Sequence, residues 1–144
     1  MEEWKIKLEE AKKEMLSAER LYFIGISVLK DSRILIKILN ELLKASFHLI
    51  EAHLKFEKKN FKDKIDGVIY FLRKIAPKYL TDEEKKDFTN LLKFSKMQKE
   101  TPLEFVRKER LIIYYNGKYE AITKDKILNY SKILRKLSKP LDIF

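Results

Sequence analysis

The sequence predicts one mainly α-helical domain over residues 1–144. An antiparallel four-helix bundle is expected over about residues 1–99, with a two-stranded β-hairpin and a final helix over about residues 100–144. Apolar or small residues recur every three or four positions over long stretches, which is typical of helices that pack along a narrow face. Near the other end of the chain, Asn116-Gly117 separates two runs rich in β-branched and aromatic residues, the strongest short-range signature of a hairpin.

The first two helices are expected over residues 2–29 and 33–59, joined by a turn so short that they must form an antiparallel hairpin. Asp31 or Ser32 supplies an N-cap for the second helix. Small residues stand at seven-residue intervals in both helices, which favours a close approach of the two backbones: Ala11, Ala18 and Gly25 in the first, and Ala45 and Ala52 in the second. Alternatively, alanine is present only because it is a good helix former. The second helix is apolar over a wide arc, which predicts a central position.

The third helix is expected to begin at a cap on Asn60 and to end before Pro77. Its inward face is predicted to be formed by Phe61, Ile65, Val68, Leu72 and Ile75. Thr81-Asp82-Glu83-Glu84 matches a capping box and opens a fourth helix that fades near Lys99.

Thr101-Pro102-Leu103-Glu104 repeats the capping logic, so a short helical turn is expected through about Arg107. The two-residue turn at Asn116-Gly117 pairs Tyr114 with Tyr119 in the following hairpin. The same register pairs Ile112 with Ala121, Leu111 with Ile122, and Ile113 with Glu120. One face of the hairpin should rest on the bundle. Thr123 caps a final helix that Pro140 is expected to stop.

Composition excludes several classes of protein. Hydrophobic residues at 45% and charged residues at 38% are typical of a globular rather than a disordered chain. With no cysteine and only two histidines, disulfides, thiolate chemistry and an ordinary structural zinc site are not expected. Apolar runs fall short of the roughly 20 residues that a membrane span needs, and the start of the chain does not read as a signal peptide. A cytoplasmic protein without cofactors or metal is therefore expected.

The two histidines are candidates for metal ligation or general acid–base chemistry. His48 and His53 are five residues apart, so they cannot ligate one metal from the same helix face. His48 lies on a polar stripe with Glu41 and Glu51, where Glu51 can orient the ring for a general base. The alternative is a solvated helix face with ordinary ion pairs. For His53, at the edge of the apolar arc, we expect hydrogen-bonded packing.

The net charge of +10 is concentrated towards the end of the chain. Residues 91–144 hold thirteen Lys or Arg against six Asp or Glu, whereas residues 1–54 hold nine of each. Such asymmetry suggests an anionic partner. Cations with interleaved tyrosines suit nucleic acid or an acidic protein. The candidate binding residues are Arg107, Lys108, Arg110, Lys118, Tyr114, Tyr119, Lys132, Arg135 and Lys136.

Two segments carry a resemblance to known proteins. Residues 28–57 (VLKDSRILIKILNELLKASFHLIEAHLKFE) and 99–123 (KETPLEFVRKERLIIYYNGKYEAIT) resemble a family of small uncharacterised archaeal helical proteins. The helical pattern is also similar to HEPN domains, helical bundles that include many ribonucleases. Their catalytic motif places an arginine four to six residues before a histidine. Here Lys44 and Glu41 precede His48 instead, so the resemblance implies a non-catalytic version.

These observations predict a non-enzymatic binding module that engages nucleic acid or an acidic protein partner through the basic residues of the C-terminal third. Two alternatives remain open. One is a HEPN-like ribonuclease or toxin-type enzyme centred on His48. The other is a structural homodimer formed through the hairpin, since an isolated two-stranded ribbon leaves unpaired edges.

Overall fold

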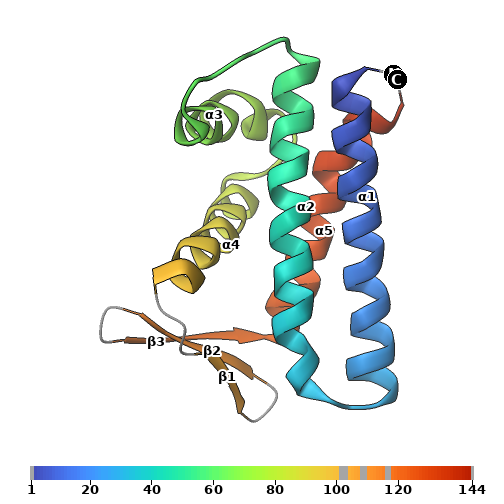
Figure 1. Cartoon of the computed structure of the whole chain (residues 1–144), viewed down its shortest axis with the longest axis vertical. Coiled ribbons are helices and arrows are strands. Elements are labelled where there is room, and N and C mark those ends of the chain that lie inside the picture. Colours follow the sequence, from blue (N-terminus) through green and yellow to red (C-terminus); the bar gives the residue numbers. More distant parts are fainter. Residues whose placement is uncertain (1, 101–103, 108–109, 116–117, 144) are drawn as a thin grey trace.

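Two long antiparallel helices form one side of the molecule (Figure 1). The computed structural model describes residues 2–100, 104–107, 110–115 and 118–143. Helix α1 (Glu3–Leu21) and helix α2 (Leu35–Phe56) make the most extensive contact between any two elements. Ala11, Ala18, Ala45 and Ala52 are all buried, so the small-residue faces meet as the seven-residue spacing predicts.

The first helical stretch continues past α1 as a π-helical segment, η1 (Tyr22–Val28). Lys30 adopts a positive φ of 54°, and a 3-10 turn, η2 (Ser32–Ile34), leads into α2. The carboxylate of Asp31 accepts a hydrogen bond from the Arg33 backbone N–H at 3.1 Å within this turn. The expected N-cap of the second helix at Asp31 or Ser32 was wrong, because α2 is preceded by Ile34 and no side chain caps it. Gly25 lies directly against Ile34, because a Cβ built on Gly25 would stand 2.6 Å from Ile34 Cγ2. The turn therefore needs a glycine at this position.

Helix α2 is the central element, as its wide apolar arc predicts. It contacts α1, α4 and α5, the strand β2, and the segment around α3. Both of its apolar rows are used: Leu35, Ile38, Leu42 and Leu49 are buried on one, and Leu39, Leu43 and Ile50 on the other.

The third helical segment differs from the expectation. Helix α3 (Lys64–Tyr70) is only seven residues long, and Asp63 rather than Asn60 caps it, accepting from the Ile65 backbone N–H at 3.0 Å. It continues as a π-helical segment, η3 (Phe71–Ile75), and a 3-10 turn, η4 (Ala76–Lys78). Phe71 and Ile75 are fully buried, whereas Phe61 is 39% and Ile65 66% exposed. The predicted inward face is therefore confirmed at Ile75 and was wrong at Phe61 and Ile65.

Helix α4 (Asp82–Glu100) begins with the predicted capping box. The Thr81 backbone N–H donates to the Glu84 carboxylate at 2.9 Å, and the Glu84 backbone N–H donates to the Thr81 hydroxyl at 3.1 Å. Phe88 and Leu91 are buried against the core, as expected.

The β signal belongs to a three-stranded antiparallel sheet in the order β1-β2-β3, formed by β1 (Glu104–Arg107), β2 (Arg110–Tyr115) and β3 (Lys118–Thr123). All four predicted pairs between β2 and β3 are confirmed, including Tyr114 with Tyr119. The turn residues 116–117 lie outside the described residues. The predicted helical turn through Arg107 was wrong, because residues 104–107 pair with β2 as a strand. Its proposed cap at residues 101–103 is outside the described residues.

One face of the sheet packs on the helices. Leu111, Ile113 and Ile122 are fully buried, whereas Ile112 and Ala121 on the opposite face are partly exposed. Strand β2 contacts α2 and α4, and β3 leads directly into α5. This confirms that one face rests on the bundle.

Helix α5 (Lys124–Asp142) closes the core behind α1 and α2 (Figure 1). The Thr123 hydroxyl caps it, accepting from the Lys126 backbone N–H at 3.3 Å. Pro140 does not stop the helix, which continues for two more residues because Leu141 is buried against the core. The four-helix core expected over residues 1–99 is also not what the structure shows. Five α-helices are present in the described residues, α3 is short, and α5 packs into the core against α1, α2 and α4.

Candidate interaction surfaces

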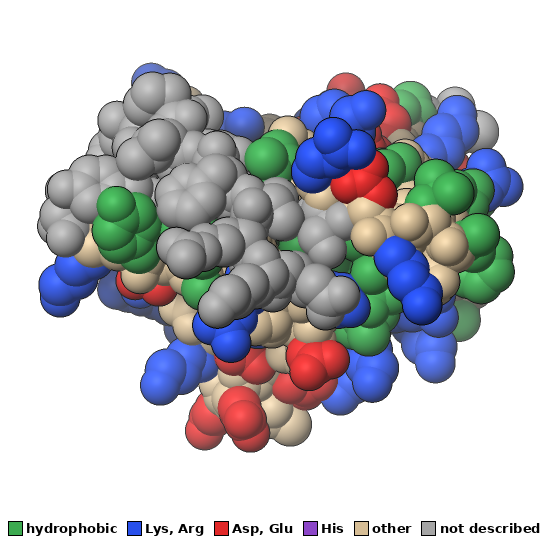
Figure 2. Space-filling view, turned by 90° about the horizontal axis from the view of Figure 1, so that it is seen from below, with side chains coloured by type: hydrophobic (Ala, Val, Ile, Leu, Met, Phe, Trp, Pro, Cys, Tyr) green, Lys and Arg blue, Asp and Glu red, His purple; other side chains and the backbone are tan. Residues whose placement is uncertain are grey.

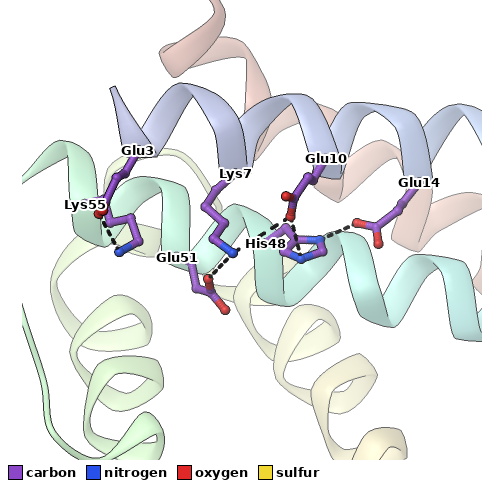
Figure 3. Close-up of polar contacts among 7 residues, drawn as sticks. All are labelled: Glu3, Lys7, Glu10, Glu14, His48, Glu51 and Lys55. Atoms are coloured by element: carbon purple, nitrogen blue, oxygen red, sulfur yellow. Dashed lines mark hydrogen bonds and ion pairs between the residues drawn. The ribbon is translucent and has the colours of Figure 1, made fainter. Parts of the chain in front are cut away.

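A row of ion pairs joins the polar edges of α1 and α2 (Figure 3). His48 lies at its centre, with Nδ1 2.5 Å from Glu14 Oε1 and Nε2 3.0 Å from Glu10 Oε2. Further along the row, Lys7 Nζ is 3.3 Å from Glu51 Oε2, and Lys55 Nζ is 3.0 Å from Glu3 Oε2. Each pair links the two helices, so the row fixes how α1 lies along α2.

The chemistry that a general base at His48 would need is not assembled here. Both ring nitrogens of His48 face carboxylates of α1. Glu51, expected to orient the ring, is paired with Lys7, and Glu41 lies 3.8 Å from Lys44. The geometry makes His48 a bridge between two helices. Among the described residues, no group of three or more acidic or histidine side chains is placed to hold a metal ion.

His53 is a buried packing residue, as expected. It is 2% exposed, and its Nε2 lies 2.7 Å from the Leu137 carbonyl oxygen on α5. The ring also lies against the rings of Phe71 and Tyr79, with centroids 5.6 and 5.5 Å away. Burial lowers the pKa of His53 from its ordinary value, while the hydrogen bond to Leu137 opposes this shift.

The basic residues predicted to bind a partner fall into two groups. Arg135 and Lys136 of α5 are engaged within the fold. The Arg135 guanidinium is paired with Glu19 of α1, and Lys136 Nζ is 2.5 Å from Glu84 Oε2 of α4. These pairs point to opposite neighbours of α5, so they hold α5 between α1 and α4.

The other group is exposed. Arg110, Lys118 and Lys132 are on the surface and form no ion pair with another described residue. Tyr119 is 64% exposed. Arg110 and Tyr119 lie on the same side of the sheet by strand alternation, and Lys118 follows on the other side. Lys108 and the side chains of Arg107 and Tyr114 are outside the described residues.

The structure shows an apolar surface that was not predicted, at the end of the molecule where a turn joins the first helical stretch to α2. Five large hydrophobic side chains of residues 16–29 are 46–68% exposed: Leu16, Phe23, Ile24, Val28 and Leu29. Figure 2, which views this end of the molecule, shows hydrophobic side chains gathered beside scattered cations. The signal that could have revealed it is the run of nine uncharged residues from Leu21 to Leu29, which is more apolar than one packed face requires.

Part of this surface is hollowed into a groove of about 370 Å³, which we call the turn-end groove. It lies along one face of α1 and η1 and is closed by the turn into α2. Its lining residues are Lys13, Leu16, Ser17, Arg20, Leu21, Ile24, Gly25, Leu29 and Ile34.

Comparison with known proteins decides the family. The sequence model of the family described as nucleoporin Nup188, N-terminal, matches residues 1–143. The chain belongs to the Nup188 N-terminal family. Searches of curated proteins and of solved structures found no significant match.

Membership of the Nup188 N-terminal family corrects three expectations. The resemblance to an archaeal family with a HEPN-like bundle was wrong, because nearly the whole chain matches a nucleoporin domain. The expected cytoplasmic location was wrong for the same reason, since a nucleoporin points to the nuclear pore. The expected RNA binding also conflicts with this family.

The nucleoporin domain is a non-enzymatic scaffold, which agrees with the expectation of a non-enzymatic protein. No helix in the described part of the chain is both long and apolar enough to cross a membrane.

Proposed function

We propose that this chain is a scaffold module that binds an acidic protein partner through exposed cations of its C-terminal third. The family supports a role in protein assembly. The surplus of positive charge in residues 91–144 supports a partner of negative charge. Such complementarity speeds encounter and excludes partners of the wrong charge more than it adds affinity.

The observation that carries the proposal is the difference between the paired and the unpaired cations. Arg135 and Lys136 are held by carboxylates of α1 and α4. Arg110, Lys118 and Lys132 have no such carboxylate among the described residues, although they are exposed. A cation that is not needed to hold the fold together remains available to a partner. The exposed ring of Tyr119 adds apolar area on the side of the sheet where Arg110 lies.

A binding measurement tests this. The full chain is titrated with a fluorescently labelled glutamate-rich peptide at several salt concentrations. We expect saturable binding that weakens with salt, because exposed charges are screened. Replacing Arg110, Lys118 and Lys132 with alanine should weaken binding at least ten-fold.

The matched control replaces Arg73, Lys74 and Lys86 with alanine, which removes the same charge from exposed positions elsewhere. Equal weakening by the control would show that only net charge matters and would contradict the proposal. Tighter binding of a single-stranded RNA of equal charge would contradict it as well.

A further inference from the structure

The turn-end groove combines an apolar floor with a basic rim. Leu16 and Ile24 are 46% and 54% exposed on one face of α1 and η1, and Leu29 is 68% exposed where the turn begins. Its volume of about 370 Å³ is within the range of clefts that accept ligands, about 300–1,000 Å³. Large exposed apolar patches with polar rims mark interaction sites on soluble proteins.

The charges around the groove are all of one sign. Lys13 and Arg20 lie on the same face of α1 as the apolar residues, and neither forms an ion pair with another described residue. None of the described lining residues is acidic. An occupant must therefore be apolar on the side that enters the groove and negative where it meets Lys13 and Arg20.

The length of the groove indicates the shape of the occupant. Its α1 and η1 lining runs from Lys13 to Gly25 at helical spacing. Twelve steps of about 1.5 Å give a groove about 18 Å long, which matches about three turns of a helix. Amphipathic helices enter such grooves through anchors at positions i, i+3 or i+4 and i+7.

We infer that the turn-end groove docks an amphipathic helix of a partner protein, with an apolar row flanked by Asp or Glu. A symmetric contact between the grooves of two copies of this chain does not fit, because it would bring Lys13 and Arg20 of both copies together without a counter-charge. This site is separate from the cations of the C-terminal third, so the inference does not rest on the function proposed above.

The test uses the full chain and three labelled 18-residue helical peptides. The first carries leucines at i, i+3, i+4 and i+7 with flanking glutamates, the second has lysine at each glutamate position, and the third has the same composition as the first with the leucines scrambled. Fluorescence anisotropy should show saturable binding of the first peptide and at least ten-fold weaker binding of the other two.

Two variants locate the site. Ile24→Asp should weaken binding of the acidic peptide at least ten-fold, whereas Ile65→Asp, at a position 66% exposed on α3, should leave it unchanged. Arg20→Glu, which keeps the apolar floor, should reduce the preference for the acidic over the lysine peptide. Circular dichroism spectra equal to that of the unmodified chain show that the variants are folded.

Several results would overturn the inference. They are absence of binding, equal binding by the Ile24→Asp variant, and equal binding of the acidic and lysine peptides. Dimerisation that depends on Ile24, or tighter binding to vesicles of anionic lipid than to the peptide, would also overturn it. In the Arg110, Lys118 and Lys132 triple alanine variant, which lacks the cations of the function proposed above, the Ile24→Asp change should still weaken binding of the acidic peptide at least ten-fold. If it does not, the groove is not the site, whatever the outcome for the function proposed above.

Discussion

The Nε2 atom of His53 on α2 lies 2.7 Å from the carbonyl oxygen of Leu137 on α5, across 84 residues of sequence. Nε2–H donates this hydrogen bond, so the buried ring can bind the carbonyl oxygen of α5 while it is neutral. Burial favours the neutral form and lowers the pKa of His53 below its ordinary 6.5. The unfolded chain therefore takes up a proton at a higher pH than the folded chain does.

The stability of the protein should accordingly depend on pH through His53. As pH falls below about 6.5, the unfolded state gains a proton that the folded state resists, so the free energy of unfolding should fall. The slope for one proton cannot exceed about 1.4 kcal/mol per pH unit. This slope is measured by urea unfolding between pH 7.5 and 5.5. The measurement uses a His48→Gln variant, in which His53 is the remaining histidine. Adding His53→Gln should flatten the slope in this range, and an unchanged slope would show that His53 is not its source.

Removal of His48 should weaken the contact between α1 and α2. His48→Ala leaves Glu10 and Glu14 close together without the ring between them, and a partly exposed pair of this kind contributes up to about 1 kcal/mol. We expect the free energy of unfolding to drop by about that amount in urea unfolding at neutral pH. Lys44→Ala, which removes an exposed lysine 3.8 Å from Glu41, should change it by less than about 0.5 kcal/mol. Equal effects of the two variants would argue against a bridging role for His48.

Two glycine substitutions should have opposite outcomes. Gly25→Ala places a Cβ 2.6 Å from Ile34 Cγ2, so overpacking at the turn should cost about 1–3 kcal/mol. Gly67→Ala, in helix α3, meets the flexible end of Leu54 at 3.1 Å and the Phe61 side chain at an ordinary contact distance of 3.6 Å. The better helix propensity of alanine should make it neutral or stabilising by up to about 1 kcal/mol. Thermal unfolding compares them. Ile34→Ala should relieve the Gly25→Ala variant, and failure to do so would show that the clash lies elsewhere.

The capping box at Thr81 should contribute about 1 kcal/mol to the free energy of unfolding. Thr81→Ala removes the hydroxyl that accepts from the Glu84 backbone N–H, and an alanine at an N-cap costs about that amount. Thr81→Asp restores an acceptor and should recover most of the loss in urea unfolding. If the aspartate variant is as unstable as the alanine variant, the hydroxyl is not acting as a cap.

Glu84 should add a second pH dependence at lower pH. Two contacts lower the pKa of Glu84 below its ordinary 4.5. The contact with Lys136 on α5 has the largest effect, and the hydrogen bond from the Thr81 backbone N–H the second largest. A lowered carboxyl pKa stabilises the folded state above about pH 4.5, and this stabilisation is lost as pH falls through the folded pKa. Glu84→Gln should reduce stability at pH 7 and lessen the dependence on pH between 5 and 3. If the variant shows the same pH dependence of stability as the unmodified chain, this dependence arises from other carboxylates.

Local signals in the sequence predicted several elements well. The Thr81–Glu84 capping box, the cap at Thr123 and the pairing of Tyr114 with Tyr119 all depend on residues close together in the chain. Strand β1 was missed because its segment follows a Thr-Pro pair that favours a helix start, whereas pairing with β2 determines its structure. Phe61 and Ile65 were wrongly placed on the inward face because helix α3 begins only at Lys64, and residue spacing does not show which turns of a helix lie against the core.

The functional surfaces depended more strongly on the tertiary fold. Sequence alone identified His48 as polar and His53 as packed, but not the carboxylates of Glu10 and Glu14, which lie 38 and 34 residues from His48. It selected Arg135 and Lys136 as binding residues, although the fold pairs them with Glu19 and Glu84. The uncharged run from Leu21 to Leu29 was a signal for the exposure of Ile24, but nothing comparable marked Leu16, which is also exposed.

The amino-acid sequence by itself determined the mainly helical class, the α1–α2 hairpin, the caps at Thr81 and Thr123, and the register of β2 with β3. These depend on interactions between residues near in the chain or on the spacing of apolar positions. Only the tertiary structure decided which cations are neutralised and which apolar side chains stay exposed. Both depend on which helix faces meet, and a face that looks apolar or charged in the sequence has no defined neighbour until the elements pack together.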